Sequence, residues 1–236
     1  MFNASAEYYD VIYTAFKDYA AEVAQVTTLL RRLNSRCHAL LDVGCGTGEH
    51  ARRLAGEGFA VDGLDIEPAF VRIASQKHPA GRFVVADMSD FHLPGRYDAL
   101  LCLFSSIGYL CTLDRVTRAL TCFREHLAPG GVALVEPWFP PGVFEANREI
   151  THSGDAQGVR VSRHARTEVT GTLSRLVFEY EIEDHGEIRR VSEVHELGLF
   201  TTGEMIQAFL EAGLDVQHDP EGLTGRGLFI ARTAHA

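Results

Sequence analysis

The chain has 236 residues, of which 46% are apolar and 23% are charged, and its formal net charge is −10. This length suits one large domain, or one domain with a sizeable insertion, and it can bury a substantial core. The negative charge repels a phosphate backbone, so we expect no nucleic-acid partner. No stretch approaches the roughly 18 apolar residues that span a bilayer, and the N-terminus lacks the layout of a secretory signal. We therefore expect a cytoplasmic protein without a membrane anchor, acting on a small molecule.

The cysteines and histidines predict neither disulfides nor a metal site. The five cysteines are odd in number and form no C-x-x-C pair, which argues against a disulfide framework and a zinc ribbon. The eleven histidines include no H-x-x-x-H and no cluster with cysteine, so we expect no bound metal. His195 by itself fits a structural role and a substrate-facing role equally well.

Short apolar strands alternate with amphipathic helices up to about residue 135. The predicted helices span residues 19–33, 49–56, 69–77 and 113–127. The predicted strands span residues 39–43, 60–64, 82–85, 98–104 and 131–135. This alternation is typical of an α/β protein in which helices cover both faces of a mostly parallel sheet.

The pattern changes after the last of these strands. Long alternating runs predict antiparallel strands over residues 159–169, 173–182 and 189–199. A helix is predicted over residues 202–212. Two further strands, 214–218 and 227–233, are expected to form an antiparallel hairpin that closes the main sheet. We therefore expect a core of residues 1–138 and 201–236 and an inserted antiparallel layer of residues 139–200. Because ligands of open α/β sheets bind at the carboxyl ends of the strands, this layer is expected to cover them.

A glycine-rich turn lies where the first predicted strand ends and a helix begins. Residues 42–48 read D-V-G-C-G-T-G. Without Cβ atoms, Gly44, Gly46 and Gly48 let a ligand approach the turning backbone and the amides at the start of the helix. Dinucleotide enzymes use a related G-x-G-x-x-G, but here the third glycine comes one position earlier and the acidic Asp42 precedes the first.

The ends of the next two strands carry groups that suit a nucleoside. Asp65 ends the second strand, where its carboxylate can accept hydrogen bonds from both ribose hydroxyls. After the third strand, Asp87 offers an acceptor for an adenine amino group, and Met88 offers a thioether to pack on the ring. Each has a plainer interpretation: Asp65 as a helix cap, Asp87 as a surface turn residue and Met88 as a core residue.

These motifs, in this order, resemble the class I S-adenosylmethionine-dependent methyltransferases over about residues 38–136, with F-S-S at 104–106 and L-A-P-G-G at 127–131. The resemblance implies a Rossmann-like α/β fold and S-adenosylmethionine as the cofactor. The cofactor-binding residues that it implies are Tyr19, Asp42, Gly44, Gly46, Gly48, Asp65, Ile66, Asp87, Met88 and Phe104.

Nearly the whole chain resembles a narrower family, the nucleotide-linked amino-sugar N-methyltransferases. Those enzymes dimethylate dTDP-3-amino sugars such as the desosamine and mycaminose precursors of antibiotic biosynthesis. The segments that carry the resemblance are Y-Y-D-V-I-Y at 8–13, K-D-Y-A-A-E at 17–22, M-S-D-F at 88–91, F-S-S-I-G-Y at 104–109, V-E-P-W-F-P at 135–140 and G-R-G-L-F at 225–229. The chain departs from the family at Gly44, where members carry Ala, and at Phe139, where they carry a second Trp.

The resemblance implies methyl transfer to the amino group of a dTDP-linked deoxy amino sugar. It places Tyr13 and Tyr109 near that amine, where phenolic oxygens can orient its lone pair as the catalytic groups. A dTDP pyrophosphate needs local cations, and Arg226 is the first candidate and Arg163 the second. Trp138 would wall the sugar or thymine site. All five also fit plainer roles, as buried rings or ordinary surface arginines.

Two other functions remain open at this point. The chain could be a class I methyltransferase of another small amine or hydroxyl, such as glycine or a polyketide oxygen, in which case Trp138, Arg163 and Arg226 have no phosphate site to form. A non-catalytic S-adenosylmethionine-binding protein is a second alternative, against which Tyr13 and Tyr109 argue. The sequence leaves open the sugar carbon that bears the amine, the number of methyl groups added, and whether the protein is a homodimer.

Overall fold

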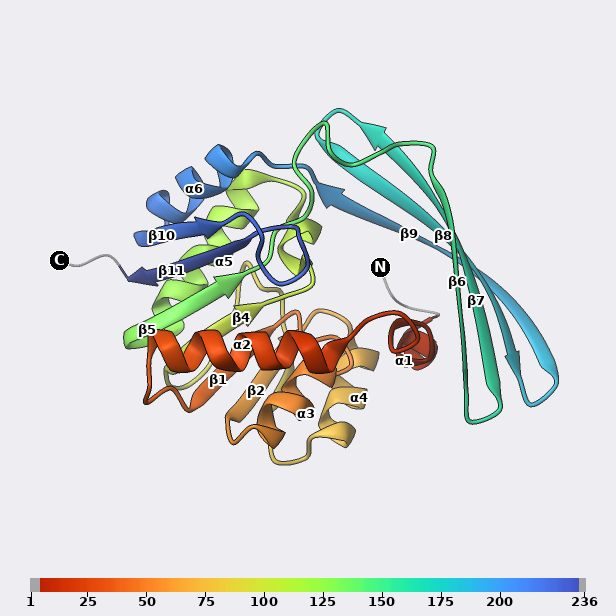
Figure 1. Cartoon of the computed structure of the whole chain (residues 1–236), viewed down its shortest axis with the longest axis horizontal. Coiled ribbons are helices and arrows are strands. Elements are labelled where there is room, and N and C mark those ends of the chain that lie inside the picture. Colours follow the sequence, from red (N-terminus) through yellow and green to blue (C-terminus); the bar gives the residue numbers. More distant parts are fainter. Residues whose placement is uncertain (1–4, 234–236) are drawn as a thin grey trace.

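Figure 1 shows the computed structural model of the chain, which describes residues 5–233. The described residues form a seven-stranded sheet with helices and a separate four-stranded sheet. The large sheet contains β1 (Ala39–Val43), β2 (Ala60–Asp65), β3 (Phe83–Val85), β4 (Tyr97–Cys102), β5 (Leu127–Val135), β10 (Leu214–Asp219) and β11 (Leu228–Thr233). The small sheet contains β6 (Glu149–Ala156), β7 (Val159–Thr170), β8 (Leu173–Asp184) and β9 (Glu187–Gly198). The helices are η1 (Ala6–Tyr8), α1 (Tyr9–Tyr13), α2 (Tyr19–Leu33), α3 (Glu49–Gly56), α4 (Pro68–Lys77), η2 (Ser106–Leu110), α5 (Leu113–His126) and α6 (Thr202–Glu211).

The large sheet has the strand order β10-β11-β5-β4-β1-β2-β3. Strands β1 to β5 pair in parallel, so their carboxyl ends meet at one edge of the sheet. Strand β11 runs antiparallel to β5, and β10 runs antiparallel to β11. The predicted Rossmann-like sheet, mostly parallel and closed by an antiparallel hairpin, is confirmed.

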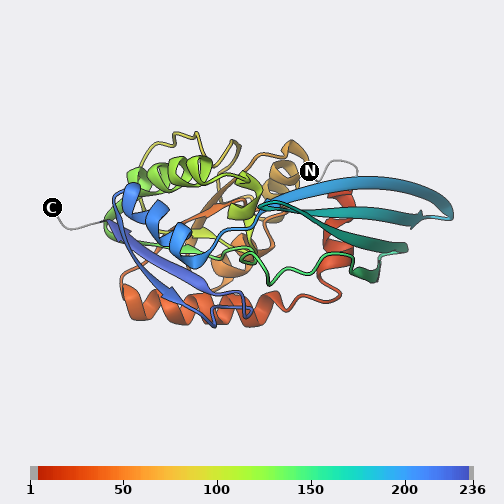
Figure 2. The ribbon, with the colours of Figure 1, turned by 90° about the horizontal axis from the view of Figure 1, so that it is seen from above.

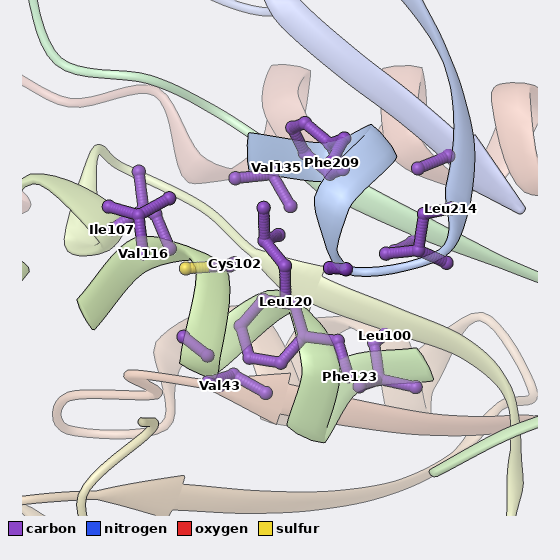
Figure 3. Packing of buried hydrophobic residues seen from close by; sticks show 14 of the residues in the cluster. Val43, Leu100, Cys102, Ile107, Val116, Leu120, Phe123, Val135, Phe209 and Leu214 are labelled. Atoms are coloured by element: carbon purple, nitrogen blue, oxygen red, sulfur yellow. The ribbon is translucent and has the colours of Figure 1, made fainter. Parts of the chain in front are cut away.

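Helices bury both faces of the large sheet. On one face, Leu100 of β4 belongs to a core with Phe123 of α5 and Phe209 of α6 (Figure 3). On the other face, Leu101 packs in a core that includes Leu54 of α3 and residues of α2. Successive side chains of a strand point to opposite faces, so a strand covered on both sides is apolar throughout. This is why the central strands could be recognised as short continuous apolar runs.

The four-stranded sheet is antiparallel throughout, which confirms the predicted inserted β layer. Its strands β6 to β9 extend away from the large sheet, and α1 lies against them (Figures 1 and 2). Ile12 and Tyr13 of α1 form a third hydrophobic core with residues of β7 and β8, among them Val161 and Phe178. The N-terminal segment and the inserted sheet are therefore packed together, although they are far apart in the sequence.

Several elements differ from the sequence-based prediction. Strand β6 was not predicted, because it is an edge strand whose residues are mostly exposed and polar and so lack an alternating pattern. The short helices η1 and α1 were also missed. Strand β4 ends at Cys102 rather than at 104, because Phe104 and Ser105 have φ values of +52° and +62°, which a strand does not accept.

Within the described residues, no helix is both long enough and apolar enough to cross a membrane. The same residues contain no group of three or more His, Cys, Asp or Glu side chains that could hold a metal ion. All five cysteines are free thiols.

Two neighbouring residues of α6 test the core assignment. Phe209 is 0% exposed, whereas Leu210 is 51% exposed. We expect Phe209→Ala to lower the free energy of unfolding by about 3–5 kcal/mol, because it opens a cavity in the core. Leu210→Ala should change it by about 0.5 kcal/mol or less. Urea denaturation of both variants measures the difference, and equal destabilisation would contradict the packing described here.

Candidate active site

A cavity of about 360 Å³ lies between the carboxyl ends of the parallel strands and the four-stranded sheet. Its walls come from the loops after β1, β2, β3, β4 and β5, and from all four strands of the small sheet. The inserted layer therefore covers the edge of the large sheet where α/β proteins bind ligands, as expected. The predicted site residues in its wall are Tyr13, Gly44, Gly46, Asp65, Ile66, Asp87, Met88, Phe104, Tyr109, Trp138, Arg163 and Arg226.

A smaller cavity, of about 40 Å³, shares the glycine loop with the larger one and adds the predicted residues Tyr19 and Asp42 to the site. Gly48 lines neither cavity. It is the N-cap of α3 with a φ of +75°, and a Cβ there would lie 2.8 Å from Cβ of Ala74. Its glycine is thus required for the packing of α3 on α4, and the structure does not bring Gly48 to the candidate site.

Gly44 allows a close approach between two loops of this chain. Its φ is +72°, and a Cβ would lie 2.8 Å from Cβ of Ser106 at the start of η2. A side chain at this position would push the loop after β1 away from the loop after β4. Both loops line the two cavities, so Gly44 keeps the backbone open to a ligand at their junction.

Asp65 holds the glycine loop to the end of β2. Its two carboxylate oxygens accept hydrogen bonds from the backbone N–H groups of Gly46 and Glu67, each at 2.9 Å. Burial raises the pKa of Asp65 above its ordinary value. Glu67 rather than Asp65 caps α4, which argues against the interpretation of Asp65 as a helix cap. Each carboxylate oxygen has a second lone pair that can accept a hydrogen bond from a ribose hydroxyl.

Asp42 is a buried acid with an unsatisfied atom. It is 2% exposed, and burial raises its pKa to about 6. Its Oδ2 atom has no hydrogen-bond partner among the described residues. Leaving a buried carboxylate oxygen without a partner is unfavourable, so the smaller cavity suits a ligand that brings a positive charge or a donor to Asp42.

Asp87, the predicted acceptor for the adenine amino group, already accepts hydrogen bonds from protein groups. Asp87 accepts hydrogen bonds from Ser89 at Oδ1 and from Arg115 at Oδ2. Although burial acts to raise the pKa of Asp87, these partners hold it below its ordinary value. An adenine amino group would have to share these oxygens. Ile66 is 44% exposed and lines the same cavity as Met88, so the two provide apolar surface for a ring.

Glu136 is an important residue that sequence analysis did not select. Its side chain is 0% exposed, and it follows β5. It accepts hydrogen bonds from the backbone N–H of Phe104 at 2.6 Å, from the Thr224 hydroxyl and from Nη2 of Arg226 at 3.2 Å. Phe104 lines both cavities with a left-handed backbone, so Glu136 holds a strained residue in the wall of the site. Arg226 is thereby ion-paired, while its Nε atom has no partner among the described residues.

The first candidate catalytic tyrosine contacts the inserted sheet. Arg163 of β7 donates hydrogen bonds to Oη of Tyr13 at 2.7 Å and to Nδ1 of His152 at 3.1 Å. Burial raises the pKa of Tyr13, and the Arg163 guanidinium only partly offsets this effect. Arg163 is 5% exposed, and its Nε atom lacks a hydrogen-bond partner in the described structure.

The second tyrosine also reaches the inserted sheet. Tyr109 of η2 lies with its Oη atom 3.1 Å from Nδ1 of His195 on β9. Burial raises the pKa of Tyr109 well above its ordinary value. Trp138 lines the same cavity and donates a hydrogen bond from Nε1 to Oγ of Ser174, 2.8 Å away. Tyr13, Tyr109, Trp138, Arg163 and Arg226 are thus brought to one cavity by elements outside the cofactor-binding loops.

Lys17 is a further charged residue near this site that was not selected from the sequence. Its Nζ atom lies 4.0 Å from the centre of the Phe104 ring, and it forms an ion pair with Glu22. Burial lowers the pKa of Lys17, although Glu22 acts to raise it. The K-D-Y segment at 17–19 carries part of the family resemblance, but only the fold shows that Lys17 lies beside Phe104.

Known proteins resemble the chain over most of its length. Residues 40–131 match the family model described as a methyltransferase domain. The chain is 37% identical to the dTDP-3-amino-3,6-dideoxy-alpha-D-glucopyranose N,N-dimethyltransferase of Streptomyces fradiae, over 95% of this chain and 89% of that protein. It is 36% identical to the dTDP-4-amino-2,3,4,6-tetradeoxy-D-glucose N,N-dimethyltransferase of Saccharopolyspora spinosa, over 95% and 91%. The chain belongs to the amino-sugar N,N-dimethyltransferase family.

Solved structures agree with this membership. DesVI of Streptomyces venezuelae is 35% identical, with a TM-score of 0.91 over 97% of this chain and 98% of that one. The S-adenosylmethionine-bound amino pentose methyltransferase CalS10 of Micromonospora echinaspora is 33% identical, with a TM-score of 0.83 over 98% and 97%. The predicted resemblance and the class I methyltransferase fold are thereby confirmed for this family member.

Asp42 generates a pH prediction for binding of S-adenosylmethionine, which carries a positive charge. The pKa of Asp42 is raised from 3.8 to about 6 in the folded, ligand-free protein, so folding favours its protonated form. The stability that this preference contributes is lost as the pH rises through this window. Binding of a cation favours the ionised form, so the affinity should fall by up to about tenfold per pH unit below pH 6.

Calorimetry between pH 5 and pH 8 measures this dependence, with Asp42→Asn as the control. The amide cannot ionise, so the variant should bind weakly and with a flatter pH profile. Identical profiles for the variant and the wild type would remove Asp42 from the cofactor site.

Proposed function

We propose that the protein transfers a methyl group from S-adenosylmethionine to the amino group of a dTDP-linked deoxy amino sugar. The observation that carries this proposal is one cavity that joins the glycine loop and Asp65 to Tyr13, Tyr109 and two arginines. The family membership supports the same reaction, since the relatives are named as N,N-dimethyltransferases of dTDP-linked amino sugars. Antibiotic biosynthesis is the setting of CalS10, which acts in the formation of calicheamicin.

The cofactor fits the groups at the ends of β1, β2 and β3. Bound there, S-adenosylmethionine supplies an electrophilic methyl group on a positively charged sulfur. The unsatisfied Oδ2 atom of Asp42 suits a cationic ligand, and the free lone pairs of Asp65 suit ribose hydroxyls. Ile66 and Met88 provide the apolar wall for the adenine ring, and Asp87 the acceptor beside it. Tyr19 and Phe104 complete the wall around the smaller cavity.

The acceptor side is built by residues from α1, η2 and the inserted sheet. Tyr13 and Tyr109 are the proposed catalytic groups, since both phenols line the cavity and can orient an amine toward the methyl group. The small sheet covers one side of the cavity, which limits the access of water to the reacting groups. We therefore propose that residues 139–200 form the substrate-binding layer of a core made of 1–138 and 201–236.

Arg163, Arg226 and Trp138 are the proposed contacts to the sugar nucleotide. Both arginines are largely buried in the cavity wall, and each has an Nε atom without a partner in the described residues. A guanidinium with spare donors suits a diphosphate, which offers several acceptor oxygens. Trp138 adds an aromatic surface to the same wall.

Methyl transfer to another small amine or hydroxyl remains the alternative, as does S-adenosylmethionine binding without turnover. Neither explains why two buried arginines line the acceptor side of the cavity. Action in the cytoplasm, the absence of nucleic-acid and membrane partners, and assembly as a homodimer stay predictions from the sequence.

A mass-spectrometric screen tests the proposed function. The purified protein is incubated with S-adenosylmethionine and, separately, with dTDP-3-amino and dTDP-4-amino deoxy sugars. We expect the mass gain of one or two methyl groups on at least one of them, and the spectrum reports the number of transfers directly. Cofactor binding without methylation of any amino sugar would contradict the proposal and favour the alternatives.

Arg226 is expected to bind the sugar nucleotide. Arg226→Ala should raise its KM about tenfold or more, the effect of one lost charged hydrogen bond, with much less effect on S-adenosylmethionine affinity. Arg226→Lys should recover part of the loss, because an ammonium makes no bidentate contact.

The matched control for Arg226 is Thr224→Val, which removes another partner of Glu136 but leaves the cation in place. Steady-state kinetics of the three variants separate the two roles. If Thr224→Val raised KM as much as Arg226→Ala, the role of Arg226 would be to hold Glu136 rather than to bind substrate.

A further inference from the structure

A chain of polar contacts leads from the cavity wall into the four-stranded sheet. Oη of Tyr109 lies 3.1 Å from Nδ1 of His195, and Nε2 of His195 lies 3.5 Å from Oε2 of Glu193. Glu193 in turn accepts hydrogen bonds from the backbone N–H and the hydroxyl of Ser5, at 3.0 and 2.7 Å. The side chains of His195 and Glu193 are 0% and 5% exposed.

The ionic contact with Glu193 favours one direction for the hydrogen bond between Tyr109 and His195. Because Nε2 of His195 faces a carboxylate, the neutral ring carries its proton on Nε2 and leaves the lone pair of Nδ1 toward Tyr109. Tyr109 remains a neutral phenol, since burial raises its pKa well above the ordinary value, and it therefore donates to Nδ1. The arrangement is a tyrosine donor, an imidazole acceptor and a carboxylate that orients the imidazole.

The surroundings keep His195 neutral and able to accept a proton. Burial lowers its pKa, Glu193 on the same strand acts to raise it, and the Arg163 guanidinium of β7 acts to lower it. The ring of Phe178 on β8 packs against the imidazole with 4.7 Å between ring centres. An imidazolium formed here would be stabilised by Glu193, the anionic group beside it.

We propose that His195 and Glu193 act through Tyr109 as the proton acceptor for the substrate amine. This inference rests on the proposed function. Aliphatic amines are largely protonated near neutral pH, and an ammonium has no lone pair with which to attack the methyl group. The structure supplies an acceptor where the amine is expected to lie.

The proton transfer balances without any further reactant. An N–H bond of the ammonium breaks and an O–H bond forms on Tyr109, while the original phenolic proton moves from Tyr109 to Nδ1 of His195. The products are a neutral amine and an imidazolium paired with Glu193. When the products leave, the proton returns through Tyr109 to the cavity and solvent. His195 and Glu193 are therefore positioning residues, and Tyr109 is the group that touches the substrate.

His195→Asn tests the proposal with dTDP-3-amino-3,6-dideoxy-alpha-D-glucopyranose as the probe. The amide oxygen can accept a hydrogen bond from Tyr109 but cannot take up a proton. We expect kcat at pH 7 to fall by about 10²–10⁴-fold, the usual effect of losing a general base, with S-adenosylmethionine affinity unchanged. The deficit should close as the pH rises above the pKa of the substrate amine, because the amine then arrives neutral.

Two further variants keep the test decisive if His195→Asn fails to fold. Glu193→Gln retains an acceptor for Ser5 but removes the charge that raises the pKa of His195, so the acidic limb of the kcat profile should move to lower pH. His164→Asn is the matched control: this histidine lies on β7, bonds Thr151 through Nδ1 and does not line the cavity, so kcat should stay unchanged.

A deficit of His195→Asn that is equal at every pH, or a Glu193→Gln profile identical to that of the wild type, would overturn the relay. Failure of the proposed function looks different, because the wild-type protein itself would then methylate neither this probe nor any dTDP-4-amino sugar.

Discussion

A carboxylate with no exposed surface must be hydrogen-bonded by groups inside the protein. The groups that bind Glu136 come from separate parts of the chain. Its donors are Phe104 after β4 and Thr224 and Arg226 in the loop before β11, while Glu136 itself follows β5. Loss of the Arg226 cation would leave this charge uncompensated in a dry environment, which is far more costly than losing a surface contact. The loops that wall both cavities are therefore held together by one charge, and the left-handed backbone of Phe104 is stabilised by it.

Apart from Arg115, which is paired with Asp87, the charges of the cavity wall that the proposed function uses are divided between its two ends. Acidic groups, Asp42 and Asp65, stand at the ends of β1 and β2, whereas Arg163 and Arg226 stand on the acceptor side. A positively charged methyl donor and an anionic sugar nucleotide each meet the opposite sign under the proposed function, and exchange of their positions would place like charges together. The overall charge of −10 says nothing of this division, because electrostatics at this range is decided by a few buried groups.

The sequence predicted the features that local patterns encode. The central strands, the glycine loop and the closing hairpin depend on apolar periodicity and on residues close together in the chain, and the structure confirms those elements. Strand β6 and helix α1 lack such a pattern, and they were missed. Glu136 was not selected, and the role of His195 was left open, because their partners, Phe104 and Tyr109, are 32 and 86 positions away and only the fold brings them together. For Gly48, whose motif position suggested a ligand contact, the structure shows a packing role instead, because a Cβ there would meet Ala74.

The cofactor side and the acceptor side differ in how they are built, and this difference bears on specificity. The groups proposed to hold S-adenosylmethionine follow consecutive strands of one sheet, where a change disturbs the core of the fold. The acceptor side instead joins distant segments: Tyr13 meets Arg163 150 positions away, and Ser5 meets Glu193 188 positions away. Relatives named for 3-amino and for 4-amino sugars have similar identity to this chain, and their named substrates differ both in the position of the amine and in the hydroxyl groups that the sugar keeps.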